Sequence, residues 1–310
     1  DCQPGKSKFG KALMLGIPVG AALGGIGTPA GSGMNAVTMS LLKSICDVEI
    51  SFAQWSMVGV PVALASTVFA WFFLCLIFKP EINVVKGLDS IKEDRKSIGP
   101  MRGDELKFAI VFAVMLVLWF IPQYTGIDMY MTAWGGIFVM SMPGMNMVDW
   151  KEMNGKIDWS AVLICGSATA LATVVSNLGT GEWLSGILAD LFLADVAGMG
   201  MLILLFVINL MMMAGHYPMP QGVSLAGLCL PVVGALALQL DLNPIVVCLP
   251  VCMSTSMLLL VPIDPTCYTT YSGGYWKIKD MMGTGVVITL GYVVISSVWT
   301  YLVSITGLLG

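Results

Sequence analysis

Residues 196–240 read VAGMGMLILLFVINLMMMAGHYPMPQGVSLAGLCLPVVGALALQL, and this stretch decides the fold. It contains no Asp, Glu, Lys or Arg and is about twice as long as the ~20 apolar residues that one membrane helix needs. Pro218 and Pro220 forbid a single straight helix. Unpaired backbone at membrane depth is tolerated only where it is buried in protein or lines a cavity. The stretch predicts two spans or a re-entrant hairpin; we expect the hairpin, with a functional site at its tip, residues 216–223.

Composition places the whole chain in a membrane. Of its 310 residues, 57% are hydrophobic and 11% are charged, against about 25% charged residues in soluble domains. The sequence therefore predicts an all-α, multi-pass integral membrane protein of a plasma or inner membrane. Further uncharged stretches long enough to span run over residues 51–78, 108–127, 129–148, 159–181, 242–263 and 281–310. The eight cysteines form no Cys-x-x-Cys pair, and we expect them to be apolar packing residues.

The basic residues indicate which loops face the cytoplasm. All 15 Lys and Arg residues except Lys43 fall within residues 6–11, 79–107, 151–156 and 277–279. The alternate connections, residues 123–128, 177–197 and 240–243, hold none. Loops rich in Lys and Arg stay on the cytoplasmic side. The sequence therefore predicts residues 80–106 inside and residues 177–197 on the opposite side.

Two other spans are interrupted. Residues 24–35 read GGIGTPAGSGMN, and their glycines and proline predict a span that unwinds partway across the bilayer. Freed carbonyls, with the side chains of Thr28, Ser32 and Asn35, suit a cation; the alternative is close packing of small residues between helices. Residues 243–277 form the second interrupted span, with prolines at its break. Two such spans separated by ordinary ones predict an inverted-repeat transporter with a midplane site.

These features together resemble the divalent anion/sodium symporter family. GGIGTPAGSGMN is similar to the family's GGIGT-x-x-G-[ST]-P-P-N signature, and YWKIKDM at residues 275–281 is similar to its aromatic-x-(I/M)-K-D-M ending. Residues 150–166 are likewise family-like. The resemblance covers essentially the whole chain. It implies that the chain starts late, without the first hairpin and most of the first repeat.

The resemblance also implies a domain organisation of two inverted repeats, each with a re-entrant hairpin and a broken helix. Residues 1–78 would close the first repeat, residues 79–107 would form a cytoplasmic loop, and residues 108–310 would form the second repeat. The second repeat would comprise spans, an interfacial helix over 180–195, the hairpin over 196–240, the broken span over 243–277 and the last span over 281–310. A homodimer surrounded by membrane lipid is expected, with no nucleic-acid partner.

The site residues are carried over from the family. There each hairpin tip carries Ser-Asn-Thr, which contacts both the substrate carboxylate and sodium. Counting back from Pro231 places this triplet at Gln221, Gly222 and Val223, so two side-chain oxygens are lost. The family's Ala-Thr-Pro after the second broken helix aligns with residues 263–265. The implied substrate-binding residues are Ser32, Gly33, Gln221, Gly222, Val223, Asp264 and Pro265, and the implied Na⁺ ligands are Gly27, Thr28, Gly31 and Asn35, with Ile263 at a second Na⁺ site.

Two ionisable residues leave alternatives open. Asp264 lies at the second break, and a carboxylate at membrane depth costs at least ~2.5 kcal/mol on insertion scales. We expect it to bind a cation or carry a proton; the alternative is a cap near the headgroups. His216, the only histidine, either relays protons or satisfies backbone carbonyls at the tip.

The sequence therefore predicts a sodium-coupled secondary transporter of small anions, dicarboxylates or sulfate, with Na⁺ as the coupling ion. A proton-coupled or exchange transporter is the alternative within that class. An intramembrane enzyme would need a Gly-x-Ser-x-Gly elbow, paired aspartates or a His-Glu-x-x-His helix, and the sequence contains none of these. An ion channel should line a continuous pore, whereas two facing broken helices favour an occluded midplane site.

Overall fold

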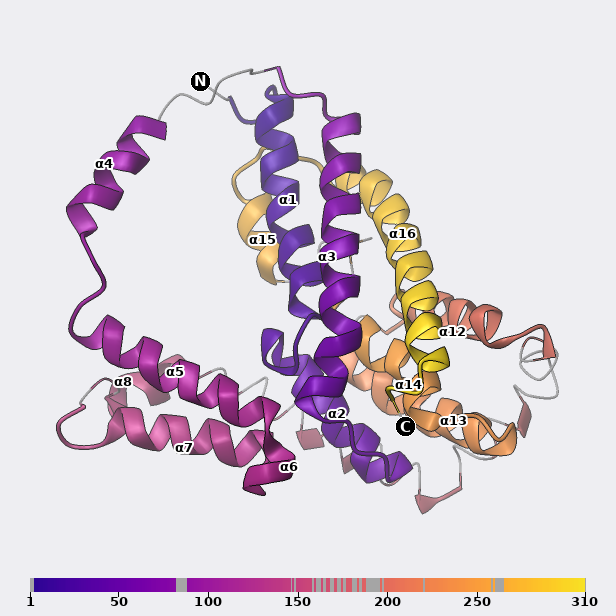
Figure 1. Cartoon of the computed structure of the whole chain (residues 1–310). Coiled ribbons are helices and arrows are strands. Elements are labelled where there is room, and N and C mark those ends of the chain that lie inside the picture. The colour runs from indigo at the N-terminus through magenta and orange to yellow at the C-terminus, as the bar shows by residue number, and fades with distance from the viewer. Residues whose placement is uncertain are drawn as a thin grey trace. The chain divides into compact units, whose positions relative to one another are not determined.

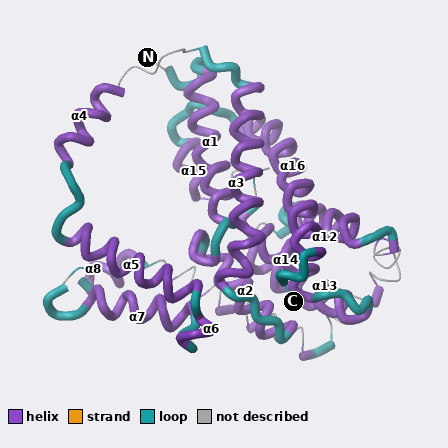
Figure 2. The backbone as a smooth tube through the Cα atoms, viewed as in Figure 1, coloured by secondary structure: helices purple, strands orange, loops and turns teal. Residues whose placement is uncertain are grey.

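The computed structural model describes most of the chain (Figure 1). The described residues are 3–81, 88–145, 147, 149–157, 159, 163, 166–167, 170–171, 174, 177–179, 183, 186–187, 196, 198–219, 221–257, 259 and 265–309. All of the described secondary structure is helical (Figure 2), which confirms the predicted all-α class. The chain divides into two compact units: unit 1 holds residues 1–50, 54–81 and 163–310, and unit 2 holds residues 51–53 and 82–162. The division into two repeats stays a prediction.

Unit 2 is a small helical unit. Its helices are α4 (Leu88–Ile98), α5 (Asp104–Phe120), α6 (Pro122–Thr125), α7 (Met129–Ser141) and α8 (Trp150–Lys156). Trp119 of α5 donates from Nε1 to the carbonyl of Met129 at 3.1 Å, and its ring stacks on Phe52 with centroids 5.2 Å apart. A Cβ on Gly136 of α7 would lie 2.2 Å from the sulfur of Met115, so the Met115 side chain of α5 fills the space beside this glycine.

Unit 1 contains all three helices that, among the described residues, are long and apolar enough to cross a membrane. Its elements are α1 (Lys8–Gly25), η1 (Pro29–Gly31), α2 (Gly33–Cys46), α3 (Phe52–Ile77), α12 (Met201–Gly215), α13 (Gly222–Gln239), α14 (Pro244–Met253), η3 (Ser254–Ser256), α15 (Pro265–Tyr271) and α16 (Ile278–Ile305). The three are α3, α13 and α16. Leu64, Val68 and Trp71 on α3 are more than 60% exposed, as a lipid-facing surface would be. The protein is therefore a multi-pass integral membrane protein, as predicted.

The starts of three helices in unit 1 follow from local capping. The hydroxyl of Ser7 accepts from the amide of Gly10 at 3.0 Å, and that of Ser32 accepts from Met34 at 3.3 Å. Asn243 accepts from the amide of Ile245 at 2.9 Å, and proline follows it at the first helical position. Such caps satisfy amide groups that lack a partner within the helix. The sequence therefore specifies where α1, α2 and α14 begin.

The two broken spans run antiparallel to each other. The first consists of α1, η1 and α2, and the second of α14, η3 and α15. The first half of each span lies against the second half of the other, so α1 packs with α15 and α2 with α14. Pairs in contact along this crossing are Gly10 and Tyr275, Ser32 and Ser256, Thr38 and Cys252, and Cys46 and Cys248. Each span is followed by a long helix, α3 or α16.

Helices α12 and α13 are separated by a turn whose described residues are 216–219 and 221. The turn lies where the prolines predicted an interruption. A Cβ on Gly222, the first residue of α13, would lie only 2.0 Å from the carbonyl oxygen of Thr255 in η3. The turn therefore packs against the second broken span. Re-entry of this hairpin from one membrane face stays a prediction, and the interfacial helix expected over residues 180–195 lies mostly outside the described residues.

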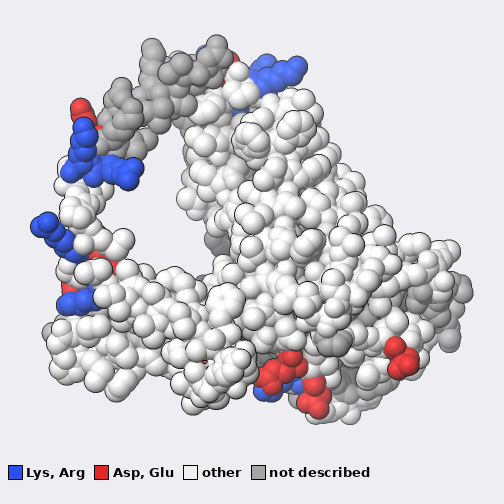
Figure 3. Space-filling view, viewed as in Figure 1, with Lys and Arg blue, Asp and Glu red and all other residues white. Residues whose placement is uncertain are grey.

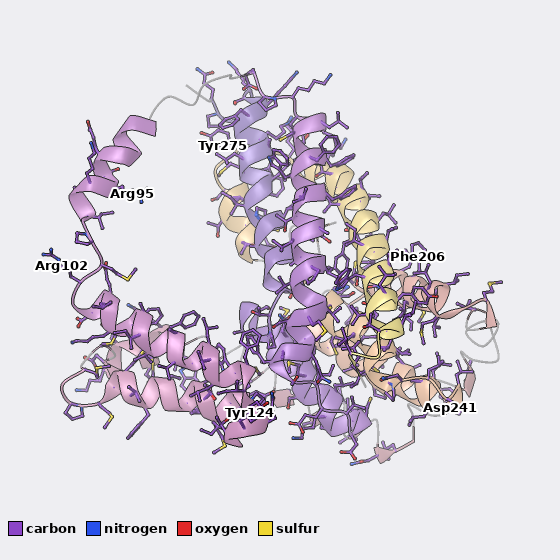
Figure 4. The ribbon with its side chains drawn as sticks, in the orientation of Figure 1. Arg95, Arg102, Tyr124, Phe206, Asp241 and Tyr275 are labelled. Atoms are coloured by element: carbon purple, nitrogen blue, oxygen red, sulfur yellow. The ribbon has the colours of Figure 1, made fainter. Side chains whose placement is uncertain are left out.

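Polar contacts tie several elements together at one end of unit 1. Lys11 of α1 forms an ion pair with Asp280 of α16 at 2.9 Å. The hydroxyl of Ser7 donates to Glu81, which follows α3. Tyr275 lies at this same end (Figure 4). In Figure 3 the visible face of unit 1 is uncharged except near its two ends, as a membrane-embedded body would be. Segments rich in Lys and Arg therefore meet at the end predicted to be cytoplasmic.

Candidate functional site

The first break is a tight backbone crossing within residues 24–35. Helix α1 ends at Gly25, and the single turn η1 at Pro29–Gly31 separates it from α2. A Cβ on Gly31 would lie 2.4 Å from the carbonyl oxygen of Gly25. No side chain fits at that contact, so glycine at position 31 is what allows the chain to fold back on itself.

Asn35 holds this break together. Its Nδ2 donates to the carbonyls of Gly25 and Thr28, both at 2.8 Å, and the residue is fully buried. These two bonds fix the amide orientation, because the flipped amide would set its oxygen against two carbonyl oxygens. Oδ1 is buried and has no hydrogen-bond partner among the described residues. The break therefore contains one buried, uncompensated oxygen.

Helix α3 supports the break from the side. Nε1 of the fully buried Trp55 donates to the carbonyl of Ile26 at 2.9 Å. A Cβ on Gly59 would lie 2.6 Å from that same oxygen and 2.7 Å from the oxygen of Gly27. The carbonyl groups of Ile26 and Gly27 therefore point toward α3. Buried backbone groups are almost always paired. Because α1 has ended, the carbonyl of Ile26 has no helical N–H donor, and the indole N–H of Trp55 takes its place.

A cavity of about 240 Å³ lies between the two broken spans. Its polar lining comes from Ser32 on the first span and from Ser256 and Thr266 on the second. The oxygens of Ser32 and Ser256 are 3.4 Å apart. The other lining residues are Pro18, Ala21, Ala22, Gly25, Gly31, Met34, Leu259 and Cys267. The described lining thus offers hydroxyl and backbone groups on an apolar wall, with no charged side chain.

One helix N-terminus lies at the cavity, and a second lies beside η3. Helix α2 starts at Gly33, directly after the cavity residue Ser32. Helix α13 starts at Gly222 against Thr255, and the side chain of Gln221 makes no capping bond there. An N-terminus carries unpaired amide groups and roughly half a positive charge. The arrangement therefore suits a negatively charged ligand.

The second break is anchored by a buried polar network. The hydroxyl of Ser254 donates to Oδ1 of Asn209 at 3.2 Å and lies 3.4 Å from the hydroxyl of Tyr292. Nδ2 of Asn209 donates to the hydroxyl of Ser297 at 3.0 Å and to the carbonyl of Leu205 at 3.1 Å. All of these side chains are buried. Helices α12 and α16 therefore position η3 from outside the broken span.

The structure brings together part of the predicted site. Ser32 and Gly31 line the cavity, and Gly33 starts the helix behind it. Gln221 is half-buried, whereas Gly222 and Val223 are buried. Gly27 faces α3, not the cavity, and neither Thr28 nor Asn35 contributes to the cavity lining. Ile263 and Asp264 lie outside the described residues, and Pro265 is described only as the first residue of α15.

Sequence reasoning missed several residues that shape the site. Trp55 bonds to Ile26, which lies 29 residues away in the sequence. Asn209 bonds to Ser297, which lies 88 residues away. A usable signal existed for Asn209, because an amide inside an otherwise apolar helix needs a partner. Ser256 could have been found as one of the hydroxyls that follow α14.

His216 lies at the turn between α12 and α13. It is 2% exposed, and its Nδ1 lies 2.7 Å from the carbonyl of Met212. With the proton on Nδ1, that nitrogen donates to Met212 and Nε2 becomes an acceptor. Nε2 is buried and has no hydrogen-bond partner among the described residues. The ring therefore satisfies the carbonyl of Met212 and also lies against the backbone of Thr255 in η3.

Comparison with known proteins identifies the family. A family model described as "Sodium:sulfate symporter transmembrane region" matches residues 2–305. The chain is 24% identical to "Sodium-dependent low-affinity dicarboxylate transporter 1" of Caenorhabditis elegans, over 94% of this chain and 55% of that protein. It is 24% identical to "Sodium-dependent dicarboxylate transporter SdcS" of Staphylococcus saprophyticus, over 93% of this chain and 58% of that protein. The chain thus spans about half the length of these relatives.

Proposed function

Because this chain belongs to the sodium:sulfate symporter transmembrane region family, we propose that it carries small anions, dicarboxylates or sulfate, across a membrane by coupling them to Na⁺. The observation that carries the proposal is the cavity between the two antiparallel broken spans, with α2 starting at its wall. The family's description as symporters supports transport over the enzyme and channel alternatives.

The cavity favours a small, polar anion. Its volume of about 240 Å³ falls below the ~300–1,000 Å³ typical of pockets for drug-sized ligands. Ser32, Ser256 and Thr266 can donate hydroxyl hydrogens to carboxylate or sulfate oxygens. The N-terminus of α2 adds amide groups and a favourable dipole. We assign the substrate to this cavity, with Gly33 and the tip residues Gln221, Gly222 and Val223 beside it.

Electrostatics favours a cation that travels with the anion. The described cavity lining holds no Lys, Arg or His, so no cationic side chain there neutralises a bound dianion. A helix N-terminus supplies only about half a charge. An uncompensated dianion in a low-dielectric site would be strongly disfavoured. Binding of Na⁺ next to the cavity supplies the missing charge, which makes anion binding depend on sodium.

The first break fits Na⁺. A hard cation prefers oxygen ligands, and Oδ1 of Asn35 is a buried oxygen that lacks a hydrogen-bond donor among the described residues. Backbone oxygens of Gly27 and Gly31 and the hydroxyl of Thr28 belong to the same turn. The carbonyls of Gly25 and Thr28 already accept hydrogen bonds from Asn35. We therefore assign Asn35 as the central sodium ligand. A second Na⁺ at Ile263 stays part of the proposal.

The test is uptake into proteoliposomes that contain the purified protein. Radiolabelled succinate and sulfate are offered separately, with an inward sodium gradient or with an equal potassium gradient. Uptake of one of the two anions should require sodium and should fall strongly in Ser32→Ala. Ser97→Ala, a substitution of an exposed serine in α4, serves as the control. Anion uptake of equal rate in sodium and in potassium would contradict the coupling.

Proton coupling is the second candidate, and the buried Nε2 of His216 favours it. Asp264 belongs to the same hypothesis, as a group that binds either a proton or a cation. An inward pH gradient without sodium should then drive uptake, and His216→Gln should remove that pH response. If a pH gradient drives no uptake while a sodium gradient does, the proton mechanism is excluded.

Topology and assembly complete the proposal. We assign residues 80–106 to the cytoplasm, a re-entrant insertion to α12 and α13, and a homodimer to the assembly. Single cysteines placed at residue 92 and at residue 178 in a cysteine-free background should be labelled by an impermeant maleimide from opposite sides. Labelling of both from the same side would contradict this topology.

A further inference from the structure

Two thiols from different helices meet in unit 1. Cys46 is the last residue of α2, and Cys248 lies in the first half of α14. Their side chains are close neighbours. The Cys46 thiol also donates to the carbonyl of Leu230 at 3.7 Å. The pair therefore joins the outer halves of the two broken spans.

Helix α13 leaves room for this pair. A Cβ on Gly234 would lie 2.5 Å from the sulfur of Cys46 and 4.0 Å from the sulfur of Cys248. Glycine at this position is therefore what allows the sulfur of Cys46 to sit against α13, with the sulfur of Cys248 beside it. A third thiol, Cys252, lies one turn along α14, but it is directed to the carbonyl of Thr38 at 4.0 Å. Cys248 is thus the thiol to which Cys46 is paired.

The two thiols differ in access. Cys248 is fully buried, whereas Cys46 is partly exposed. Cys46 lines a cavity of about 350 Å³ together with Pro231, Gly234 and the exposed residue Asp47. A small polar reagent can therefore reach Cys46 first, and the buried Cys248 can react only with what has formed on Cys46.

We propose that Cys46 and Cys248 form a modification site, an oxidisable thiol pair that a peroxide converts into a disulfide between α2 and α14. The sulfur of Cys46, as the thiolate, attacks one peroxide oxygen and breaks the O–O bond, which leaves a sulfenic acid and a hydroxide; the hydroxide takes up the proton lost by the Cys46 thiol and becomes one water. The sulfur of Cys248 then attacks the sulfur of Cys46, and the hydroxyl leaves as a second water after taking up the Cys248 proton. Two thiols are oxidised and one hydrogen peroxide is reduced.

The location suits this chemistry. Lys43, one turn before Cys46, is the one basic residue that the charge pattern places outside the cytoplasm. Disulfides form and persist on that side of a plasma or inner membrane. A metal site is not favoured, because among the described residues no group of three His, Cys, Asp or Glu side chains could hold an ion. The crosslink would hold together the two spans whose breaks carry Ser32 and Ser256.

The experiment exposes the purified protein to hydrogen peroxide, alkylates it under denaturing conditions and maps its peptides by mass spectrometry. We expect a loss of two hydrogens, two fewer alkylated thiols, and one crosslinked peptide pair containing Cys46 and Cys248 that dithiothreitol separates. Cys46→Ser and Cys248→Ser should each abolish the crosslink. Cys229→Ser, which removes a partly exposed thiol on α13, should leave it unchanged.

The same samples give a second measurement. A disulfide that closes a long loop restricts the unfolded chain, so peroxide should raise the Tm of the wild type and of Cys229→Ser but not of the other two variants. Sulfinic acid on Cys46 with Cys248 still alkylated would overturn the proposal, as would a crosslink to any other cysteine. Cys46→Ser and Cys248→Ser each remove one partner of the pair. If one of these variants fails to fold, the other still tests the proposal. Neither readout depends on transport.

Discussion

The two breaks differ in where their backbone finds its support. In the first, Asn35 bonds to carbonyls only 7 and 10 residues earlier in its own span, and Trp55 of α3 adds one bond from outside. In the second, Ser254 is held by Asn209 of α12 and lies beside Tyr292 of α16. A break that is satisfied mostly within its own span keeps its shape better when its neighbours move than one that is held from outside. The first break therefore suits a preorganised ion site, and the second suits an element that responds to the hairpin.

Asn35→Ala should give the largest effect. It removes two hydrogen bonds and leaves the buried carbonyls of Gly25 and Thr28 without their side-chain donor. At ~1–3 kcal/mol for each unsatisfied buried group, the variant should lose about 2–5 kcal/mol of stability. Sodium should no longer raise its Tm, because the proposed ligand Oδ1 is also gone. Thermal unfolding in detergent, with and without sodium, measures both effects.

The matched variant is Asn35→Asp, which keeps an oxygen in place of Oδ1 but replaces the donor Nδ2 with a second oxygen. It should be destabilised in potassium and partly rescued by sodium, since a cation then compensates the added carboxylate. Equal sodium protection of the wild type and of Asn35→Ala would show that the first break does not hold the ion.

Gly222→Ala should have the next largest effect. Its Cβ would lie 2.0 Å from the carbonyl oxygen of Thr255, so backbone must shift and the tip must move away from η3. Overpacking of this kind costs about 1–3 kcal/mol. Anion uptake should fall while sodium protection of the first break remains, because the two breaks are supported separately.

Gly20→Ala is the control for that substitution. Gly20 lies in α1, where an added Cβ would have no described atom within 4 Å, and alanine favours a helix over glycine by roughly 0.5–1 kcal/mol. It should therefore unfold at the same or a slightly higher temperature. If Gly20→Ala lost as much uptake as Gly222→Ala, the close contact between Gly222 and Thr255 could not be the cause of the loss.

Ser254→Ala tests the external anchor with a smaller expected change. It removes one neutral hydrogen bond to Asn209, worth about 0.5–1.5 kcal/mol. Combined with Asn209→Ala, the two effects should not add, because both substitutions break the same bond. A double-mutant cycle on unfolding free energies measures this coupling. Full additivity would mean that the bond does not position η3.

Much of the fold could be predicted from the sequence because glycine and proline act locally. The break within residues 24–35 and the interruption between α12 and α13 follow from backbone preferences that no tertiary contact overrides. The lengths of the uncharged stretches 51–78 and 281–310 predicted the spans that the structure shows as α3 and α16. The N-cap residues Ser32 and Asn243 are likewise local signals, because Gly33 follows the first and Pro244 follows the second. Local chemistry therefore set the places where the membrane helices start and stop.

Tertiary pairing could not be predicted in this way. Nothing near Trp55 indicates that its indole nitrogen bonds to Ile26, and nothing near Cys46 indicates Cys248 as its neighbour. The thiol contact arises from the antiparallel crossing of two spans separated by about 200 residues of sequence. The resemblance placed a sodium site at this turn, but it did not show that Asn35 supports its own backbone. The side-chain contacts between the two broken spans could be identified only from the three-dimensional structure.

The smallest expected effect concerns the end of unit 1 that both broken spans share. The hydroxyl of Ser7, with the amide of Phe9 at 3.0 Å, holds the pKa of the Glu81 carboxyl below its usual range. A carboxyl with a lowered folded-state pKa stabilises the fold at pH values above its unfolded pKa, ~4.3, and loses that contribution as the pH falls through the folded-state pKa. Glu81→Gln should therefore lower the Tm by a constant amount above about pH 5, and the difference should shrink below ~4.3.

Glu81 touches neither break, so its loss should leave the effect of sodium on the Tm unchanged at neutral pH. Ser7→Ala should also weaken the acid dependence, because it removes the main cause of the lowered pKa, and it should add a pH-independent loss from the missing cap of α1. Scanning calorimetry from pH 7 to pH 3.5 separates the two contributions by their slopes. If Glu81→Gln abolished sodium protection, the first break would depend on remote support after all, and the contrast with the second break would fail.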